Sequence, residues 1–404
     1  MSEQRPITFL CLASEFKGIP FIQEAKRQGC QVLLLVNEKF VDKPWPWDSI
    51  DEHFRMPELS QQPDVTYAIS YLARSRKIDR IIALDDYDVA TAASLREHLR
   101  LPGMGESIAR YFRDKLAMRV RARDAGIVVP DFSAVFNDDD LRDFTDRVAP
   151  PWVLKPRFEA GAVGIRKLRA SDQLWQALES LGDQRSFYLL EQFVPGDVYH
   201  VDAIISEREI VFSVASKYGA PPLSITQGGG IFNTRTLARD SEEARTVTRQ
   251  LRELMAALQI ERGVTHTEFI RGQDGRFYFL ETAARVGGAN IDKLVEAATG
   301  LVLWAETARL EITAVRGQPY RLPPARQDYA GLIICLARQQ HPDLTPYQDP
   351  EIVWRLDNKE YHAGLIVASP DPRRVEQLLT GYNQRFAADF LAVGQPKTEV
   401  RHNI

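Results

Sequence analysis

The first hundred residues of the chain alternate fully apolar runs with amphipathic ones, and this alternation limits the fold more than any other feature. Residues 7–13, 31–37 and 79–88 read as strands, whereas residues 19–29 and 64–78 have the helical spacing of apolar residues. Strands that are apolar along their length are typical of parallel sheets covered by helices on both faces. We therefore expect a doubly wound parallel α/β domain over residues 1–107.

Acidic residues end the last of these predicted strands. Asp85, Asp86 and Asp88 follow the run "RIIAL". Ligands of such sheets commonly bind beyond the carboxyl ends of the strands. The three carboxylates therefore either contribute to a ligand site or only solvate a loop.

The rest of the chain reads as a mixed α/β region followed by a smaller α+β region. Helical patterns are expected at residues 108–126, at 171–182 with Ser171 as a possible N-cap, and at 241–258. A Pro-rich stretch at 317–328 is a plausible boundary. We expect one domain over residues 108–315 and an α+β subdomain over 316–404 that packs against it.

A predicted hairpin brings two glutamates together. If Asp274 and Gly275 form a two-residue turn, counting outward places Glu268 directly opposite Glu281 on one face. His266 lies on that face, and the same count adds the apolar Ile270 and Phe279. Like charges facing each other repel, so either the face is open to solvent, or one carboxyl is protonated, or a cation lies between them. Mg²⁺ commonly takes one or two carboxylates together with substrate phosphates.

Two further motifs fit a nucleotide. Lys155 ends a predicted strand before a loop with Gly161 and Gly164, where backbone N–H groups and a lysine can bind phosphate oxygens. The loop matches neither the P-loop nor the dinucleotide glycine pattern, and a plain glycine hairpin is the alternative. Glu191, in "LLEQFV", could accept a hydrogen bond from an adenine amine, or simply end a strand.

Taken in order, these motifs resemble the ATP-grasp superfamily of carboxylate ligases. The resemblance covers about residues 108–312 and rests on RDKLAMR, VLKP with its glycine loop, EQFV, THTEF and FLETAARVGG. It implies ATP and Mg²⁺ as cofactors, with Mn²⁺ as a possible substitute. It also divides the domain into a nucleotide-closing part at about 151–192 and a metal-binding and catalytic half at about 193–315.

The resemblance assigns roles to individual residues. Phosphate contacts fall to Lys115 and Lys155, and the adenine pocket to Glu191, Phe193 and Val194. Glu268 and Glu281 would hold the metal, while Arg285, together with Lys155, would act on the reacting acyl phosphate.

This chain departs from the family pattern at two positions. Many members carry Asn two residues after the second metal glutamate, where this chain has Ala283. The ribose-binding carboxylate would fall near Val198, so we expect Asp197 to replace it. A third metal ligand is therefore missing or supplied from elsewhere.

The stretches GVTHTEF and VYHVDAI resemble the branch that contains L-amino acid ligases. This implies an amino acid or small carboxylic acid as acyl donor and an amine as acceptor, joined through an acyl phosphate with release of ADP and phosphate. His266 either touches substrate or packs beside the site, and the glycine-rich loop at 228–230 forms a lid, a carboxylate-binding loop or an ordinary connection. The candidate substrate contacts are His200, Asp202, Gly229, His266, Arg285, Gly287 and Gly288.

Composition narrows the remaining choices. The net charge of −4 and pI of about 6.1 give no reason to expect nucleic acid or an anionic membrane as partner. The three scattered cysteines, the lack of a signal-peptide pattern and the lack of an apolar run of ~20 residues favour a cytoplasmic protein with small-molecule substrates. The resemblance also allows a homodimer. Two alternatives stay open: a purine-biosynthesis-type or carboxylase-type ATP-grasp enzyme, and a nucleotide-binding protein without catalysis.

Overall fold

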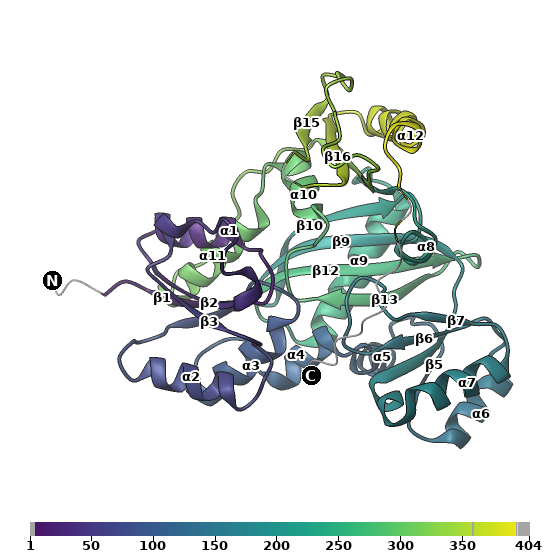
Figure 1. Ribbon diagram of the computed structural model, residues 1–404, viewed down its shortest axis with the longest axis horizontal. Helices are drawn as coiled ribbons and strands as arrows, with labels where there is room; N and C mark the ends of the chain where they lie inside the picture. Colours follow the sequence, from purple (N-terminus) through teal and green to yellow (C-terminus); the bar gives the residue numbers. More distant parts are fainter. Residues whose placement is uncertain (1–4, 358, 393, 395–404) are drawn as a thin grey trace.

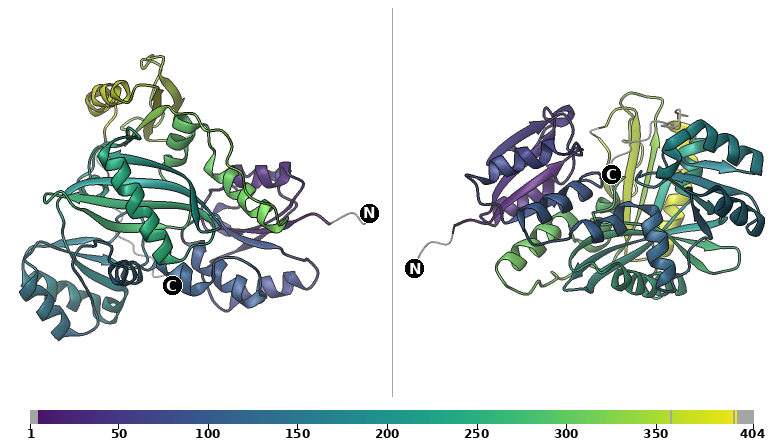
Figure 2. Two further views of the ribbon diagram at one scale, coloured as in Figure 1. Left: turned by 180° about the vertical axis from the view of Figure 1, so that it is seen from behind. Right: turned by 90° about the horizontal axis from the view of Figure 1, so that it is seen from below.

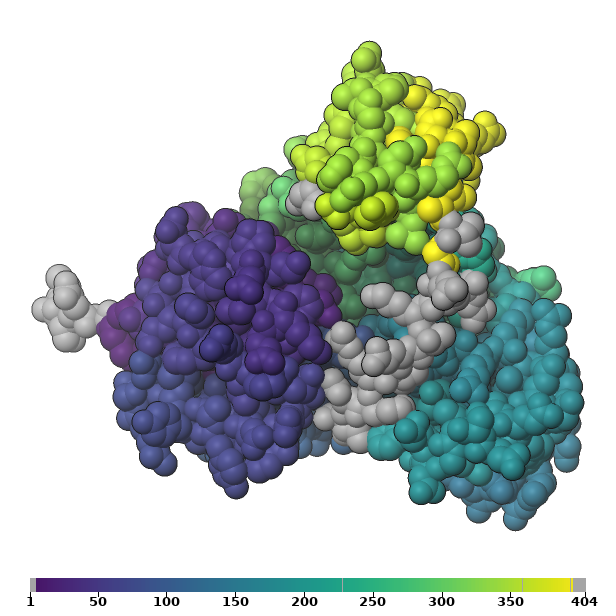
Figure 3. Space-filling model, in the orientation of Figure 1, coloured from purple at the N-terminus to yellow at the C-terminus, as the bar shows by residue number. Residues whose placement is uncertain are grey.

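A computed structural model describes residues 5–357, 359–392 and 394 of the chain. Three β-sheets organise this part of the molecule (Figure 1). In the space-filling view the N-terminal domain and the unit around β6 (Trp152–Pro156) form separate lobes, with the C-terminal region above them (Figure 3).

The N-terminal sheet is four-stranded and parallel, in the order β3-β2-β1-β4, as the apolar runs predicted. Successive residues of β1 serve two cores: Phe9 and Cys11 face α1, whereas Leu10 and Leu12 face α2 and α3. The short strand β3 was not predicted, because its residues are only partly buried. The elements are β1 (Thr8–Ala13), α1 (Ile19–Arg27), β2 (Gln31–Asn37), β3 (Glu52–Met56), α2 (Asp64–Ala73), β4 (Arg80–Ala83) and α3 (Asp88–Leu99).

The acidic residues after β4 have separate structural partners. Asp88 accepts hydrogen bonds from the backbone N–H (3.0 Å) and the hydroxyl (2.5 Å) of Ser14, which tie α3 to the end of β1. Asp85 forms an ion pair with Lys17. Asp86 alone of the three lines the cavity described below.

The stretch predicted as one helix at 108–126 forms two helices. α4 (Glu106–Arg113) and α5 (Lys115–Asp124) are separated by Asp114, which has an extended backbone (φ −97°, ψ 106°). The Asp114 carboxylate accepts hydrogen bonds from the N–H groups of Leu116 and Ala117, so it caps α5. The prediction was wrong here because the periodic spacing of apolar residues continues through both helices. The break between them depends on the extended, capping Asp114, which that spacing does not reveal.

A second four-stranded sheet, in the order β5-β8-β6-β7, forms the lobe around β6. Its helix α7 begins at Ser171, and the cap position is Ala170, so the prediction of Ser171 as the N-cap was wrong by one residue. The remaining elements of this lobe are β5 (Phe132–Ala134), α6 (Asp138–Arg147), β7 (Arg166–Leu168), α7 (Ser171–Leu181) and β8 (Tyr188–Gln192).

The largest sheet is eight-stranded, in the order β13-β12-β9-β10-β11-β14-β16-β15. Its last three strands come from the C-terminal region, so this region extends the same sheet. The strands are β9 (Gly196–Ser206), β10 (Glu209–Tyr218), β11 (Phe232–Thr236), β12 (Gly263–Gly272), β13 (Phe277–Ala283), β14 (Tyr329–Leu336), β15 (Ile352–Arg355) and β16 (His362–Ser369).

Helices cover both ends of this sheet. α9 packs on β9 and β10 (Figure 2, left), α10 and α12 pack on β14 and β16, and α11 packs on α1 of the N-terminal domain. The pairs Arg309–Glu24 (2.9 Å) and Arg80–Glu311 (3.1 Å) reinforce the contact between α11 and that domain. The bounds of these helices are α9 (Glu242–Leu258), α10 (Ile291–Thr299), α11 (Leu303–Val315) and α12 (Pro372–Asp389), and the short helix α8 (Pro222–Gly228) lies between β10 and β11 in the chain.

The three cysteines, Cys11, Cys30 and Cys335, are free thiols buried in the protein. In the part of the chain that the structure describes, no helix combines the length and the apolar character needed to cross a bilayer.

Candidate active site

A cavity of about 660 Å³ lies between the lobes and is lined by loop residues of the N-terminal domain and by residues of the other two sheets. Asp86 comes from the N-terminal domain, Lys115 from α5 and Lys155 from β6, while Glu268 and Glu281 come from β12 and β13. A volume of this size is in the range of pockets that hold nucleotide-sized ligands. The motifs predicted from the sequence therefore converge on one space.

The paired glutamates lie opposite each other, as predicted: Glu268 pairs with Glu281 in the register of β12 and β13. The turn differs from the prediction, however. Gly272 N–H donates to the Arg276 carbonyl (2.9 Å), and Gly275 has φ +78°, so the loop has three residues rather than two. The longer loop moves the pairing of the two strands by one residue. A β-bulge, in which Leu280 and Glu281 together lie opposite Glu268, moves the pairing back by one residue.

Because of the same bulge, Phe279 does not lie on the face of the two glutamates, where it was predicted. Phe279 pairs with Phe269 and packs against it on the opposite face of the sheet, with ring centroids 6.1 Å apart. Leu280 lines the cavity instead, beside Glu281. The prediction was wrong because counting from a two-residue turn assumes unbroken alternation along the strand.

Cations surround Glu281. The Lys115 Nζ lies 3.1 Å from Glu281 Oε2 and also donates to the Glu159 carbonyl. Burial alone would raise the pKa of Glu281, but Lys115, Lys155 and Arg119 together lower it to about 2. The carboxylate is therefore ionised at neutral pH.

Two side chains hold the other glutamate. The Tyr218 hydroxyl donates to Glu268 Oε1 (2.7 Å), and His266 Nε2 lies 3.6 Å from the same oxygen. Among the described residues both contacts engage Oε1, which leaves Oε2 for a cation. Carboxylate oxygens facing each other across two strands fit the preference of hard divalent ions such as Mg²⁺.

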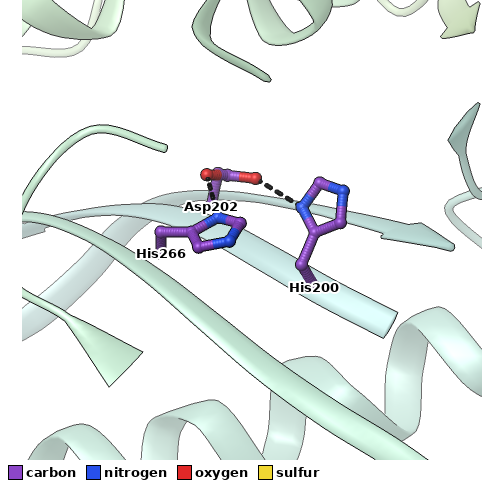
Figure 4. A group of neighbouring side chains, drawn as sticks. All are labelled: His200, Asp202 and His266. Carbon is purple, nitrogen blue, oxygen red and sulfur yellow. Dashed lines mark hydrogen bonds and ion pairs between the residues drawn. The ribbon is translucent and has the colours of Figure 1, made fainter. Parts of the chain in front are cut away.

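His266 belongs to a group of two histidines and an aspartate, of which His200 and Asp202 are buried (Figure 4). Asp202 bonds to His200 Nδ1 (2.8 Å) and to His266 Nδ1 (2.9 Å), and His200 Nε2 bonds to Thr234 Oγ1 (2.8 Å). These atoms are close enough to hold a metal, but each Nδ1 already faces an Asp202 oxygen. A carboxylate that bonds to both rings fixes the orientation of the imidazoles.

The charges in this group favour a protonated His266. Burial lowers the pKa of His266, but Asp202 and Glu268 outweigh burial and raise it to about 10. Burial also lowers the pKa of His200, and here burial outweighs Asp202, which raises that pKa. The Asp202 carboxylate, although burial opposes its ionisation, has a pKa well below its usual range because of the two rings.

On the nucleotide side, Glu191 does not have a free carboxylate. Its Oε1 accepts from Lys155 Nζ, and its Oε2 lies 3.1 Å from Arg119 Nε. Burial lowers the pKa of Lys155 to about 8, although Glu191 raises it. The Glu191 side chain is the counter-ion of two buried cations and also lines the cavity, so its bond from an adenine amine stays a prediction.

Of the residues predicted to contact the base and ribose, two line the apolar wall of the cavity and Asp197 does not. Phe193 and Val194 line the cavity, as do Val198 and Leu280. Asp197 does not, because alternate residues of β9 face opposite sides, and it pairs with Lys217 (2.7 Å) with 60% of its side chain exposed. The expectation that Asp197 replaces the ribose-binding carboxylate is therefore wrong.

The glycine loop between β6 and β7 reaches the cavity through part of its length. Gly161, at φ +72°, lines it, whereas Gly164, at φ +70°, is absent from the lining. Left-handed backbone of this kind suits glycine. The carbonyls of Phe158 and Glu159 in the same loop accept hydrogen bonds from Arg113 and Lys115.

The predicted substrate contacts divide into two groups. His266, Arg285 and Gly288 line the cavity. Outside its lining lie His200, Asp202, Gly229 and Gly287, with His200 and Asp202 fully buried behind the wall.

Sequence reasoning missed several residues of this site. Arg119 lies four residues after Lys115, on the same face of α5, and that spacing could have revealed it. Tyr218 ends β10, and no local pattern marks it. Arg113 was not predicted either, because it meets Asp86, which the sequence did single out, only through the tertiary fold.

Comparison with known proteins finds a known domain in part of the chain and a known fold over most of it. A model of the ATP-grasp domain matches residues 148–293. An L-arginine-specific L-amino acid ligase of Bacillus subtilis is 25% identical over 261 residues, which are 62% of this chain and 62%, less than two thirds, of that protein. The crystal structure of the L-amino acid ligase from Bacillus licheniformis has a TM-score of 0.76 at 18% identity, covering 97% of this chain and 100% of that one.

A carboxyaminoimidazole ribonucleotide synthase of Aspergillus clavatus, solved in complex with ATP, has a TM-score of 0.70 at 16% identity and covers 94% of this chain and 99% of that one. The chain therefore contains a region, residues 148–293, that matches the ATP-grasp domain, as the order of its motifs predicted. Its fold is shared by an amino acid ligase and by a ribonucleotide synthase, so the fold does not choose between their reactions.

Proposed function

We propose that the protein is an ATP-dependent carboxylate–amine ligase that forms an acyl phosphate and releases ADP and phosphate. The observation that carries the proposal is the convergence on one cavity of paired glutamates, two lysines and Arg285. Similarity to an L-amino acid ligase at 25% identity supports an amino acid or small carboxylic acid as acyl donor.

The arrangement of charges suits a nucleotide lying along the cavity. Phe193, Val194, Val198 and Leu280 offer an apolar surface to the base. Lys115 forms an ion pair with Glu281, and Lys155 forms one with Glu191. Each lysine can exchange its carboxylate partner for phosphate oxygens. Mg²⁺ held by Glu268 and Glu281 would supply further positive charge to the phosphates.

In the proposed first step a carboxylate oxygen of the substrate attacks the γ-phosphorus of ATP, and the bond to ADP breaks. Lys115 and Lys155 neutralise charge on the phosphoryl oxygens, since phosphoryl transfer depends mainly on positioning and electrostatics. In the second step the amine attacks the carbonyl carbon, a proton leaves the nitrogen, and phosphate departs. Arg285 stabilises the negative oxygen of the tetrahedral centre.

The test combines ATP, Mg²⁺ and pooled amino acids, with ADP release and product mass as readouts. We expect ADP release that requires both an acyl donor and an amine, and a product with the mass of an amide. Glu281→Gln serves as the inactive variant. Glu261→Gln, which removes a surface carboxylate exposed over 62% of its side chain, serves as the matched control.

Two results would overturn the proposal. Turnover that depends on bicarbonate and yields no amide would favour the carboxylase-type reaction, which the shared fold allows. ATP binding without ADP release under any substrate pool would favour a nucleotide-binding protein without catalysis.

A further inference from the structure

A chain of buried polar contacts connects the glycine loop to Arg285 through the N-terminal domain. The Arg113 Nη2 donates to the Phe158 carbonyl (2.6 Å), and its Nη1 pairs with Asp86 Oδ2. Asp86 Oδ1 lies 3.6 Å from Arg285 Nε. Asp86, from the segment after β4, therefore stands between the two arginines.

The last contact in this chain is incomplete. Among the described residues neither Asp86 Oδ1 nor Arg285 Nε has a hydrogen-bond partner, and both atoms are buried. Their separation exceeds a hydrogen bond by roughly half an ångström. Leaving a buried donor and a buried acceptor unpaired is costly, so a small movement that joins them is favourable.

Within the described part of the chain, Arg285 makes one hydrogen bond through its side chain. Its Nη1 donates to the Val286 carbonyl (2.8 Å), a bond to its own neighbour in sequence. Asp86 is the carboxylate that faces the Nε side of the guanidinium. Because the guanidinium is planar and rigid, a second contact at its Nε would set its direction toward the cavity.

We infer that Asp86 is a positioning residue that orients Arg285 toward the reacting carboxyl group and couples this orientation to the glycine loop through Arg113. The inference rests on the proposed function and deepens it. Because Phe158 belongs to the glycine loop, movement of that loop onto the nucleotide moves Arg113, and Arg113 moves Asp86. Arg285 is then fixed only when the nucleotide loop and the N-terminal domain are both in place.

The rival role for Asp86 is direct binding of a substrate ammonium group, since Asp86 also lines the cavity. The charges oppose this role. The Asp86 carboxylate already lies against two guanidinium groups, of Arg113 and Arg285, which balance its charge without a substrate ammonium group.

The test compares Asp86→Asn and Asp86→Glu with Glu311→Gln. The control removes the carboxylate of another arginine pair between the N-terminal domain and the rest of the chain, Arg80–Glu311, outside the 660 Å³ cavity. Formation of the acyl phosphate is measured by trapping it with hydroxylamine, using an amino acid that the unmodified protein accepts.

We expect Asp86→Asn to lower kcat at least about 10-fold with the KM for the amino acid changed less than about 3-fold. Asp86→Glu should recover part of the rate, and Glu311→Gln should keep it. A KM raised at least about 10-fold at unchanged kcat would overturn the inference in favour of ammonium binding. Equal loss in Glu311→Gln would overturn it in favour of general destabilisation.

A structural readout keeps this inference separate from the proposed function. If the unmodified protein releases no ADP with any substrate, the ligase proposal fails, and crystal structures with ADP and Mg²⁺ then test Asp86 alone. We expect Arg285 Nε within hydrogen-bond distance of Asp86 in the unmodified protein and turned away in Asp86→Asn. The same Arg285 direction in both would overturn the inference.

Discussion

Replacing Glu191 with glutamine should strongly destabilise the protein in the absence of nucleotide. Glu191 is the shared counter-ion of Lys155 and Arg119, and the three side chains are 5%, 7% and 0% exposed, respectively. Glutamine has nearly the same shape but no charge. The substitution therefore leaves two buried cations beside each other without their anion.

The magnitude follows from the separation of the charges. Arg119 Nε lies 3.1 Å from Glu191 Oε2, and opposite unit charges about 3 Å apart attract by about 5 kcal/mol at an effective dielectric constant of about 20. Part of this attraction offsets desolvation, but the variant keeps the desolvation of both cations and loses the attraction. Removing one partner of a buried pair typically costs about 3–5 kcal/mol, and we expect this loss in the free energy of unfolding.

Urea denaturation without nucleotide at pH 7 measures the effect. The control is Glu52→Gln, which removes the partner of Arg76 from a pair exposed over 39% and 37% of its side chains, and should cost less than about 1 kcal/mol. ATP should restore part of the stability of Glu191→Gln, because its phosphates supply the missing negative charge to Lys155. A loss below about 1 kcal/mol for Glu191→Gln would refute the reasoning.

Four further predictions address the site and the N-terminal sheet. Glu281→Gln should lower ADP release at least about 100-fold, and undiminished turnover would contradict a role in metal binding. Arg285→Lys should lower turnover about 100-fold, because a point charge does not reproduce a planar fork; near-normal rates would remove it from the reacting centre. Gly287→Ala should reduce turnover, since its Cβ would lie 2.8 Å from Asp202 Oδ1 and disturb the histidine group; unchanged rates would show that the group adapts. Burial raises the pKa of Asp88 to about 7, so its contribution to stability is present below about pH 4 and is lost as the pH rises toward 7. The free energy of unfolding of Asp88→Asn minus that of the unmodified protein should therefore rise over this range, and a flat difference would disprove the shift.

The sequence predicts the local features of this protein well. The apolar runs of the first hundred residues identify β1, β2 and β4, because burial on both faces leaves a continuous signal. The pairing of Glu268 with Glu281 is also correct, although two errors of one residue, in the turn and in the strand, cancel. That the motifs meet in one cavity was predicted from the family resemblance, because no single segment indicates it.

What the sequence does not predict depends on contacts between distant segments. The partners of Glu191, the ion pair of Asp197 with Lys217 and the contact of Asp86 with Arg113 join positions that local patterns do not relate. The joining of β14 to β11 likewise depends on which sheet edge is open after the other strands have paired. Side-chain roles at such positions need the tertiary structure.

The bulge on β13 has a consequence for how this cavity can change. In a regular strand, neighbouring residues face opposite sides, so an apolar wall residue and a charged one cannot be adjacent in sequence on the same side. Here Leu280 and Glu281 both reach the cavity. Shortening the strand by Leu280 would keep the two glutamates in register but would take away a piece of the surface offered to the base, so affinity for the nucleotide could be altered without moving the carboxylates.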